Sequence, residues 1–318
     1  MQIALIAAAL AFMVLHGINT GAALLALGGS VRPLGVWTGA LILTLGVFGA
    51  PFLLGTGVAT TLASEIVGFA SIRDAQMTVL VAVLVTIVVV SALTFLRIPT
   101  SMTLALVTAL TGYAVGVDGR VHWATMGKVL AMLALAPAVA GLIAWLLTPL
   151  QRFVPRLQYP LLVGSLHVAA FSLLCFAYGG NDAQKMLAVW FIALGGPAGS
   201  AVPADVWQLA LCAVVFGAGS LLGMRRMAKT MATGVIAARH HDIALTEVAT
   251  AGTLTLSTLF GSPAGMAQAL SGALVGVGLS KGMGRIRWRQ VSKIAMVWVV
   301  TVPIAFLLAM AIGKVIQA

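Results

Sequence analysis

Long apolar stretches follow one another along the whole chain and leave few alternatives for its fold. The stretch 76–96, for example, has no charged residue and is long enough to cross the roughly 30 Å hydrocarbon core of a bilayer as a helix. Hydrophobic residues make up 61% of the chain and charged residues 8%, and its mean hydropathy is +1.10, values that exclude a soluble globule. The sequence therefore predicts an all-α polytopic membrane protein.

The remaining composition narrows the function classes. A formal net charge of +11 would suggest nucleic acid as a partner of a soluble protein, but in a membrane protein Lys and Arg mark topology, so we expect no nucleic acid partner. Cys175 and Cys212 stand alone within apolar stretches, so neither a disulfide framework nor a metal site is expected, and no cofactor. Met1 and Gln2 provide no basic leader region, so the first apolar stretch is expected to be a retained span.

The second half of the sequence repeats the first at an offset of about 162 to 169 residues. We therefore divide the chain into a first repeat, 1–150, and a second repeat, 151–318, within one membrane domain. The aligned pairs occur in the same order in both halves: Gly17 and Gly179, Asn19 and Asn181, Gly55 and Gly223, the runs 98–102 and 262–266, Gly112 and Gly276, Trp123 and Trp288, and Lys128 and Lys293.

Each half reads as about five membrane segments. The first segment of each half is expected to be broken at its Gly-Asn motif, and the segments around Pro99 and Pro263 are short, as in helical hairpins. The predicted segments are 3–28, 35–54, 76–96, 99–117 and 124–148 in the first half, and 158–197, 205–223, 242–260, 263–280 and 290–315 in the second.

The odd number of segments predicts that the two repeats are inverted relative to each other. The basic residues test this prediction, because they concentrate in cytoplasmic loops. With both termini outside, the outer loops and the C-terminal end hold only Arg73, Arg120 and Lys314. We therefore expect a multi-pass protein of the plasma or bacterial inner membrane with both termini outside. The inner loops collect Arg32, Arg97, Arg152, Arg156, Arg225, Arg226, Lys229, Arg239, Lys281, Arg285, Arg287 and Arg289.

The run 178–185, Tyr-Gly-Gly-Asn-Asp-Ala-Gln-Lys, is a polar interruption of an apolar segment, and such groups at membrane depth usually face a protected cavity. Gly179 and Gly180 weaken the helix, and Asn181 or Asp182 would be a good N-cap. A half-helix starting after the break would direct free N–H groups inward, which is a natural anion site.

Asp182 would repel such an anion by roughly 4 kcal/mol at about 4 Å and an effective dielectric near 20. A cation or proton between the two would reverse this penalty, so the motif suggests that an anion and a coupling cation bind together. Lys185 adds positive charge or pairs with Asp182. The alternative is that the glycines only permit close helix packing and that Asp182 and Lys185 form a satisfied ion pair.

Other polar residues carry weaker signals. Ser101 and Thr103 follow Pro99 at a helix start, but such hydroxyls often bond their own backbone, and their counterparts are Gly265 and Ala267, with Gln268 and Ser271 nearby. His16 adjoins the first motif and is either a proton relay or a packed core histidine. Glu65 and Glu247 are either functional or else interfacial or capping carboxylates.

At these motifs the chain resembles the PiT family of inorganic phosphate transporters, which carries a duplicated Gly-x-Asn-Asp motif and a Pro-x-Ser-x-Thr motif in each half. The resemblance covers nearly the whole chain and is most specific at 179–185 and 272–278. It implies cation-coupled uptake of phosphate, with Na⁺ or H⁺ as the driving ion, at a central site built from both halves.

The chain departs from the family pattern at several positions. Thr20 replaces the aspartate of the first motif, Gly265 and Ala267 replace the second serine and threonine, and the family's histidine is Leu104 in one copy and Gln268 in the other. Sulfate permeases of the same family resemble this edited pattern, so sulfate is the alternative substrate.

We therefore predict a secondary transporter that imports phosphate, with a transported Na⁺ as the only metal ion considered. Self-association into a homo-oligomer and a passive channel are left open. An intramembrane aspartyl protease is a further alternative, but it needs two embedded aspartates and only Asp182 is clearly embedded. The candidate substrate-binding residues are Asn19, Thr20, Ser101, Thr103, Asn181, Asp182, Gln184, Lys185 and Gln268, and the coupling ion is assigned to Asn19, Asn181 and Asp182.

Overall fold

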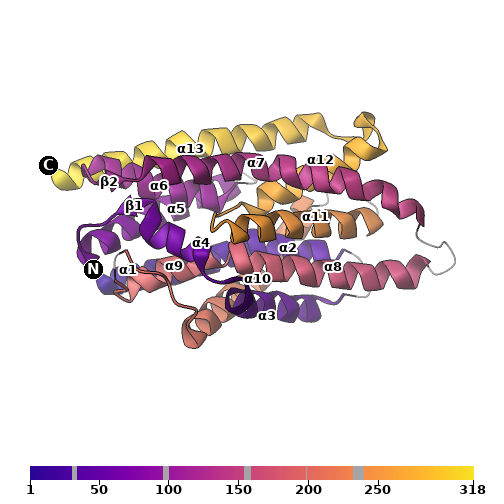
Figure 1. The fold of residues 1–318 in the computed structure, drawn as a ribbon, viewed down its shortest axis with the longest axis horizontal. Coiled ribbons are helices and arrows are strands. Elements are labelled where there is room, and N and C mark those ends of the chain that lie inside the picture. The colour runs from indigo at the N-terminus through magenta and orange to yellow at the C-terminus, as the bar shows by residue number, and fades with distance from the viewer. Residues whose placement is uncertain (31–33, 96–99, 154–158, 198, 232–239) are drawn as a thin grey trace.

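The structure is a computed structural model that describes residues 1–318 except 31–33, 96–99, 154–158, 198 and 232–239. Most of its helices run along the long axis of the molecule, and both termini lie at the same end (Figure 1). A two-stranded antiparallel pairing of β1 (Val67–Gly68) with β2 (Arg120–Val121) lies toward that end. The predicted all-helical class is therefore confirmed, with this minor addition.

The main helices lie at the positions of the predicted segments, and several short helical turns between them were not predicted. In the first half they are α1 (Gln2–His16), η1 (Gly17–Gly21), α2 (Ala22–Gly28), α3 (Val36–Leu54), α4 (Gly57–Thr60), η2 (Thr61–Glu65), α5 (Ile72–Phe95), α6 (Met102–Gly116), α7 (Trp123–Leu147) and η3 (Thr148–Phe153). In the second half they are α8 (Tyr159–Asn181), α9 (Gln184–Ala193), α10 (Val206–Met231), α11 (His240–Leu259), α12 (Met266–Lys281), η5 (Met283–Arg285) and α13 (Trp288–Gln317).

Among the described residues, 6 helical stretches are long and apolar enough to cross a membrane. They are 2–28, 36–54, 72–93, 123–151, 206–224 and 288–317. Their outward faces carry large exposed apolar side chains, such as Trp37, Leu53 and Val299, which a lipid environment accommodates and water does not. The protein is therefore a multi-pass membrane protein.

α6 and α12 are too short to span a bilayer. They have 15 and 16 residues, which gives about 23 Å of helix against the roughly 30 Å of the hydrocarbon core. Each packs against the helix before it, α6 against α5 and α12 against α11. The N-terminal ends of both short helices lie inside the protein, next to the Gly-Asn motif of the second half.

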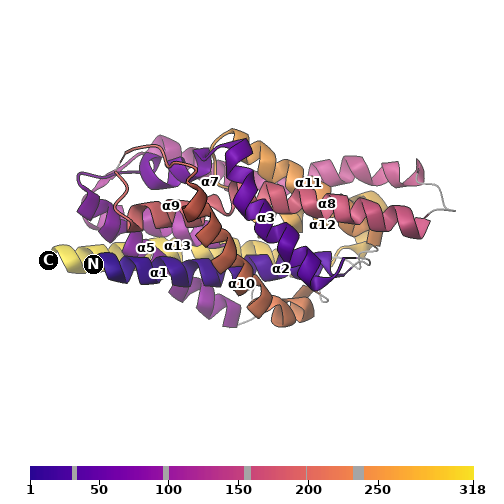
Figure 2. The same cartoon turned by 90° about the horizontal axis from the view of Figure 1, so that it is seen from below.

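The two Gly-Asn motifs differ in their backbone. In the second half the helix is interrupted as predicted, because α8 ends at Asn181 and α9 begins at Gln184. In the first half the predicted break is wrong, since η1 is a π-helical turn that joins α1 to α2 without leaving helical geometry. Figure 2 shows α1 and α2 in line, with α10 crossing them.

Glycines in both motifs allow close approach to the other half. A Cβ on Gly17 would overlap the carbonyl oxygen of Phe216 in α10, and a Cβ on Gly179 would overlap that of Gly46 in α3. The packing role that was the alternative interpretation of these glycines is therefore present. It also explains why η1 stays helical, because its backbone is held against α10.

Helices of each half pack against helices of the other half. α6 packs against α13 and α12 packs against α7, while α3 lies on α8 and α10 lies on the helix formed by α1, η1 and α2. Each half therefore supplies the packing surface for the corresponding elements of the other, and most of the buried apolar side chains form a single cluster.

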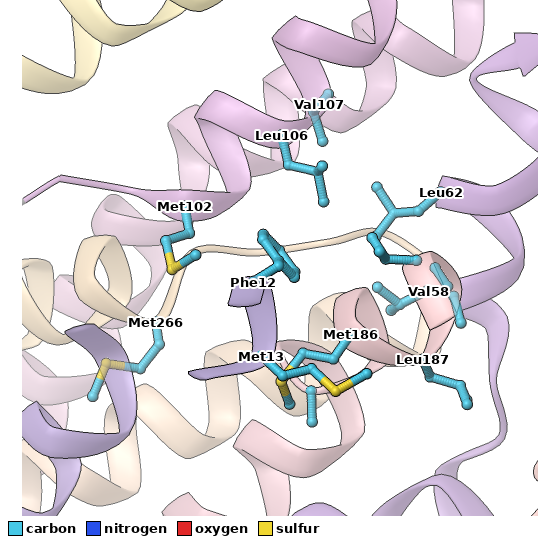
Figure 3. Packing of buried hydrophobic residues seen from close by; sticks show 14 of the residues in the cluster. Phe12, Met13, Val58, Leu62, Met102, Leu106, Val107, Met186, Leu187 and Met266 are labelled. Carbon is cyan, nitrogen blue, oxygen red and sulfur yellow. The ribbon is translucent and has the colours of Figure 1, made fainter. Parts of the chain in front are cut away.

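The centre of that cluster joins elements of both halves. Figure 3 shows Phe12 of α1 in the middle of the cluster, with Met102 of α6 and Met266 of α12 to one side and Met186 of α9 below. Phe12 and Met186 are fully buried. This packing fixes the starts of the two short helices next to the break between α8 and α9.

Candidate functional site

Asn181, the last residue of α8, holds the turn between α11 and α12. Its Oδ1 accepts a hydrogen bond from Ala264 N at 2.8 Å, and its Nδ2 donates to Thr258 Oγ1 and to Ser262 O, both at 3.1 Å. The side chain is fully buried. Because both of its polar atoms are occupied by protein groups, Asn181 positions the turn in this conformation.

Asp182 caps α12, the second helix of the α11–α12 hairpin. Its Oδ2 accepts a hydrogen bond from Met266 N, the first residue of α12, at 3.1 Å. Its Oδ1 pairs with Lys185 Nζ, which also donates to Ala264 O at 2.6 Å. The relative exposures are 3% for Asp182 and 0% for Lys185. The ion pair that the sequence offered as an alternative is therefore formed.

The start of α9 differs from the expected anion site. The helix begins at Gln184, and its N-cap Ala183 makes no side-chain cap bond. Lys185 N bonds to Asp182 O at 3.3 Å and Met186 N to Ala183 O at 3.0 Å. The first turn of α9 therefore satisfies much of its own backbone, and the predicted capping by Asn181 or Asp182 within the same helix is wrong. Both side chains bond the 264–266 backbone instead.

The hydroxyl groups of Ser101 and Thr103, from the first half, lie next to the same turn before α12. Ser101 is the N-cap of α6, accepting from Leu104 N at 3.3 Å, and its Oγ lies 3.5 Å from Gln268 Oε1. Thr103 Oγ1 donates to Ala264 O at 3.3 Å. The structure therefore brings six of the predicted residues into one buried cluster at the starts of α6, α9 and α12. They are Ser101, Thr103, Asn181, Asp182, Lys185 and Gln268.

Gln184 points away from this cluster. Its Nε2 donates to Gly55 O at 2.7 Å, and its Oε1 accepts from Ala59 N at 2.9 Å. The side chain thus ties α9 to the segment between α3 and α4.

Asn19 and Thr20 are half-buried in η1. Within the described residues no hydrogen bond links either side chain to the Asp182 cluster.

His16 and Tyr178 were not assigned a role in binding. They occupy equivalent positions just before Gly17 and Gly179, and their rings lie 6.3 Å apart, beside Phe216. Both are fully buried, and in the part of the chain that the structure describes neither the imidazole nitrogens nor the phenol oxygen has a hydrogen-bond partner. The sequence analysis did not single out this pair, although the repeat alignment places the two residues opposite each other.

The two glutamates and the two cysteines have different surroundings. Glu65 is exposed and accepts a hydrogen bond from Thr61 Oγ1 at 2.8 Å, as an interfacial carboxylate does. Glu247 is fully buried and pairs with His167. Cys175 and Cys212 are free and buried, and no group of three or more metal-ligating side chains occurs among the described residues.

Comparison with known proteins identifies the family. Residues 16–160 and 151–309 each match the model of the phosphate transporter family. The chain belongs to this family. The predicted resemblance to phosphate transporters is confirmed.

The relatives that match most of the chain are named as phosphate transporters. A probable low-affinity inorganic phosphate transporter of Mycobacterium leprae is 31% identical over 93% of this chain and 73% of its own length. One from Mycobacterium bovis is 30% identical over 84% of this chain and 65% of its own length, so the chain is shorter than these relatives. A solved structure titled "The sodium-dependent phosphate transporter" has a TM-score of 0.81 over 100% of this chain and 99% of that one, with 19% identity. These relatives favour a transporter over an enzyme.

Proposed function

We propose that this protein is a secondary active transporter that imports inorganic phosphate across the cell membrane, driven by Na⁺ or H⁺. The observation that carries the proposal is the buried ion pair of Asp182 and Lys185 at the start of α12, with the Ser101 and Thr103 hydroxyls beside it. The names of the relatives support phosphate as the substrate.

The ion pair suggests how an anion and a cation bind together. While Asp182 holds Lys185 and caps α12, the positive charge and the helix N-terminus are both occupied. A coupling cation or proton that takes over the charge of Asp182 releases Lys185 and the α12 N–H groups for phosphate. Charge-assisted hydrogen bonds from an ammonium and backbone N–H groups are strong anion ligands.

The buried side chains of His16 and Tyr178, which lack hydrogen-bond partners in the described part of the chain, fit the same binding scheme. A buried polar atom without a hydrogen bond costs about 1–3 kcal/mol, so His16 and Tyr178 are groups that a ligand would satisfy. We assign them to the substrate side of the site together with Ser101 and Thr103. Asn19 and Thr20, on the helix that follows His16, would approach the site in a conformation where the two halves have moved.

Phosphate is favoured over sulfate by the acceptors in the cluster. Near neutral pH phosphate still carries P–OH groups that donate hydrogen bonds, whereas sulfate is fully deprotonated and only accepts them. Asp182 and the Oε1 of Gln268 are acceptors beside the cluster's donors, and they would leave a sulfate oxygen facing another oxygen. A sulfate permease is the alternative outcome of the test below.

We further propose that the halves are inverted repeats of five segments and that both termini face outward. The exchanged packing of α6 with α13 and α12 with α7 supports the repeats. The termini and β2, with its Arg120, lie toward one end of the molecule, and the turn before α13, with Arg285, lies at the other (Figure 1). Labelling of single cysteines at 120 and 285 in intact cells with a charged, membrane-impermeant thiol reagent would test the orientation.

The function is tested by reconstitution in liposomes. Labelled phosphate and labelled sulfate are offered separately, with an Na⁺ gradient or a proton gradient imposed one at a time. Phosphate accumulation that depends on one of the gradients supports the proposal, and empty liposomes are the control. Accumulation of sulfate alone would make the protein a sulfate permease. Uptake indifferent to both gradients would make it a channel.

A further inference from the structure

A second pair of ionisable side chains is buried away from the Asp182 cluster. His167 of α8 and Glu247 of α11 are both 0% exposed, with Nδ1 and Oε2 2.9 Å apart. The other ring nitrogen, Nε2, lies 2.8 Å from the carbonyl oxygen of Gly28, the last residue of α2. His167 lies about 21 Å along α8 from Asn181 at the usual helical rise.

The geometry sets how many protons the pair holds. A carbonyl oxygen only accepts, so the Nε2 of His167 carries a hydrogen and donates it to Gly28. The contact between Nδ1 and Glu247 then requires one further proton, on either the imidazole or the carboxyl. In both forms the pair is neutral overall. Apart from this 2.9 Å contact, neither Nδ1 of His167 nor either carboxyl oxygen of Glu247 has a hydrogen-bond partner among the described residues.

Among the described side chains, no other charge compensates this pair. Neither α2 nor α3 has a titratable side chain, and α8 carries Cys175 and Tyr178 in addition to His167. The charged groups described on the other packed elements are engaged elsewhere: Lys185 of α9 with Asp182, Lys281 of α12 with Asp242 at the start of α11, beside His241, and Lys128 of α7 with Phe260 O. Loss of the shared proton would leave a bare charge in an apolar surrounding, which is strongly unfavourable.

The first repeat shows that the fold does not need an ionisable pair here. At the repeat offset, His167 corresponds to Leu5 and Glu247 to Val83, and both of these are fully buried in the apolar core. Apolar contacts are generally at least as stabilising as a buried ion pair. A polar pair retained in only one of two equivalent places therefore points to a role beyond packing.

The chemistry of the pair fits a proton better than Na⁺. Na⁺ is a hard cation bound by several oxygens, as Ca²⁺ and Mg²⁺ are. Here an imidazole lies between Glu247 and the carbonyl of Gly28, and that carbonyl already accepts a hydrogen bond. A buried carboxyl in contact with an imidazole is, by contrast, an ordinary place to hold one proton.

We propose that His167 and Glu247 form a proton-binding site of the transporter in addition to the coupling-ion position at Asp182, and that phosphate import is driven by H⁺. This inference rests on the proposed function. The pair joins α2, which continues the first motif, to α8, which carries the second motif, and to α11, whose Thr258 bonds Asn181. Since the pair cannot lose its proton while buried, proton exchange with water requires this contact between the halves to open.

The experiment uses the full chain in liposomes with a pH-sensitive dye inside. Two variants are compared with wild type: E247Q, and the double variant H167L/E247V, which copies the first repeat. Two quantities are measured: phosphate accumulation under an inward proton gradient, with proton influx from the dye, and exchange of labelled for unlabelled phosphate without a gradient. E65Q is the matched control, because Glu65 is an exposed carboxylate.

In wild type and E65Q, the gradient is expected to raise accumulation at least about tenfold, with proton influx. In both variants, exchange continues while gradient-driven accumulation and proton influx fall to the no-gradient level. A purely structural role would lower exchange and accumulation together, which would overturn the inference. If the double variant does not yield folded protein by size-exclusion chromatography, E247Q decides alone.

Two outcomes separate this inference from the proposed function. Wild-type accumulation that follows only an Na⁺ gradient, without proton influx, overturns the proton site and leaves phosphate import intact. Wild-type protein that neither accumulates nor exchanges phosphate removes the proposed function itself, and the proton site with it.

Discussion

The Oδ2 atom of Asp182 accepts a hydrogen bond from the backbone N–H of Met266 at 3.1 Å, so the N-terminus of α12 is capped from the end of α8. In the other half, Ser101 caps α6 from its own N-cap position. The residue equivalent to Ser101 is Gly265, which has no side chain to offer. The two halves therefore satisfy the same helix terminus in two ways, and only one of them involves an ionisable group paired with a lysine.

Asp182→Asn is expected to abolish gradient-driven phosphate accumulation. Asparagine keeps an oxygen for Met266 N–H but loses the charge that pairs with Lys185 or a coupling cation. We expect a loss of at least about tenfold, with the protein still inserted in the membrane. Transport assays in liposomes and membrane fractionation measure the two effects. Asp118→Asn, at an exposed position, is the control, and undiminished accumulation by Asp182→Asn would refute the role of Asp182.

Lys185→Met is expected to destabilise the protein by about 3–5 kcal/mol, because it leaves the buried carboxylate of Asp182 without its partner. The double variant Asp182→Asn/Lys185→Met removes both charges and should regain much of the lost stability without regaining transport. Thermal unfolding of the purified protein in detergent measures this. Equal destabilisation in the single and double variants would show that the pair is not coupled.

Gly179→Ala is expected to destabilise the packing of α8 on α3 by about 1–3 kcal/mol, as overpacking usually does. The added methyl would overlap the backbone carbonyl of Gly46, which cannot move by a side-chain rotation. The neighbouring Gly180→Ala is the matched control, because its methyl would meet only the flexible end of Leu54. A smaller drop in melting temperature for Gly179→Ala than for Gly180→Ala would contradict the proposed packing role.

Tyr178→Phe is expected to maintain or raise stability and to weaken phosphate binding. The phenol oxygen has no hydrogen-bond partner among the described residues, so its removal costs the folded protein nothing. If the hydroxyl binds phosphate, the KM for phosphate rises by about fivefold to tenfold, equivalent to one hydrogen bond of about 1 kcal/mol. Uptake kinetics and thermal unfolding are measured together, and an unchanged KM would exclude Tyr178 from the site.

The sequence by itself determined the order of the main helices, the bounds of several of them and the position of the main interruption. The expected segment 35–54 is α3 (Val36–Leu54), and 124–148 is α7 (Trp123–Leu147). Hydropathy and helix breakers are local properties of the chain, so they can be read in order. The interruption after Asn181 was equally local, because it depends on two glycines and polar residues in an apolar segment.

The tertiary structure alone decided which partner each polar group takes. Asp182 bonds an N–H that is 84 positions away, and Gln184, adjacent to the motif, turns to the α3–α4 segment instead. η1 remains helical because α10 packs against its glycines, and His167 meets Glu247 only where α8 lies on α11. A buried hydrogen-bonding group takes whichever partner the packing leaves unsatisfied nearby, and that proximity is set by the fold as a whole.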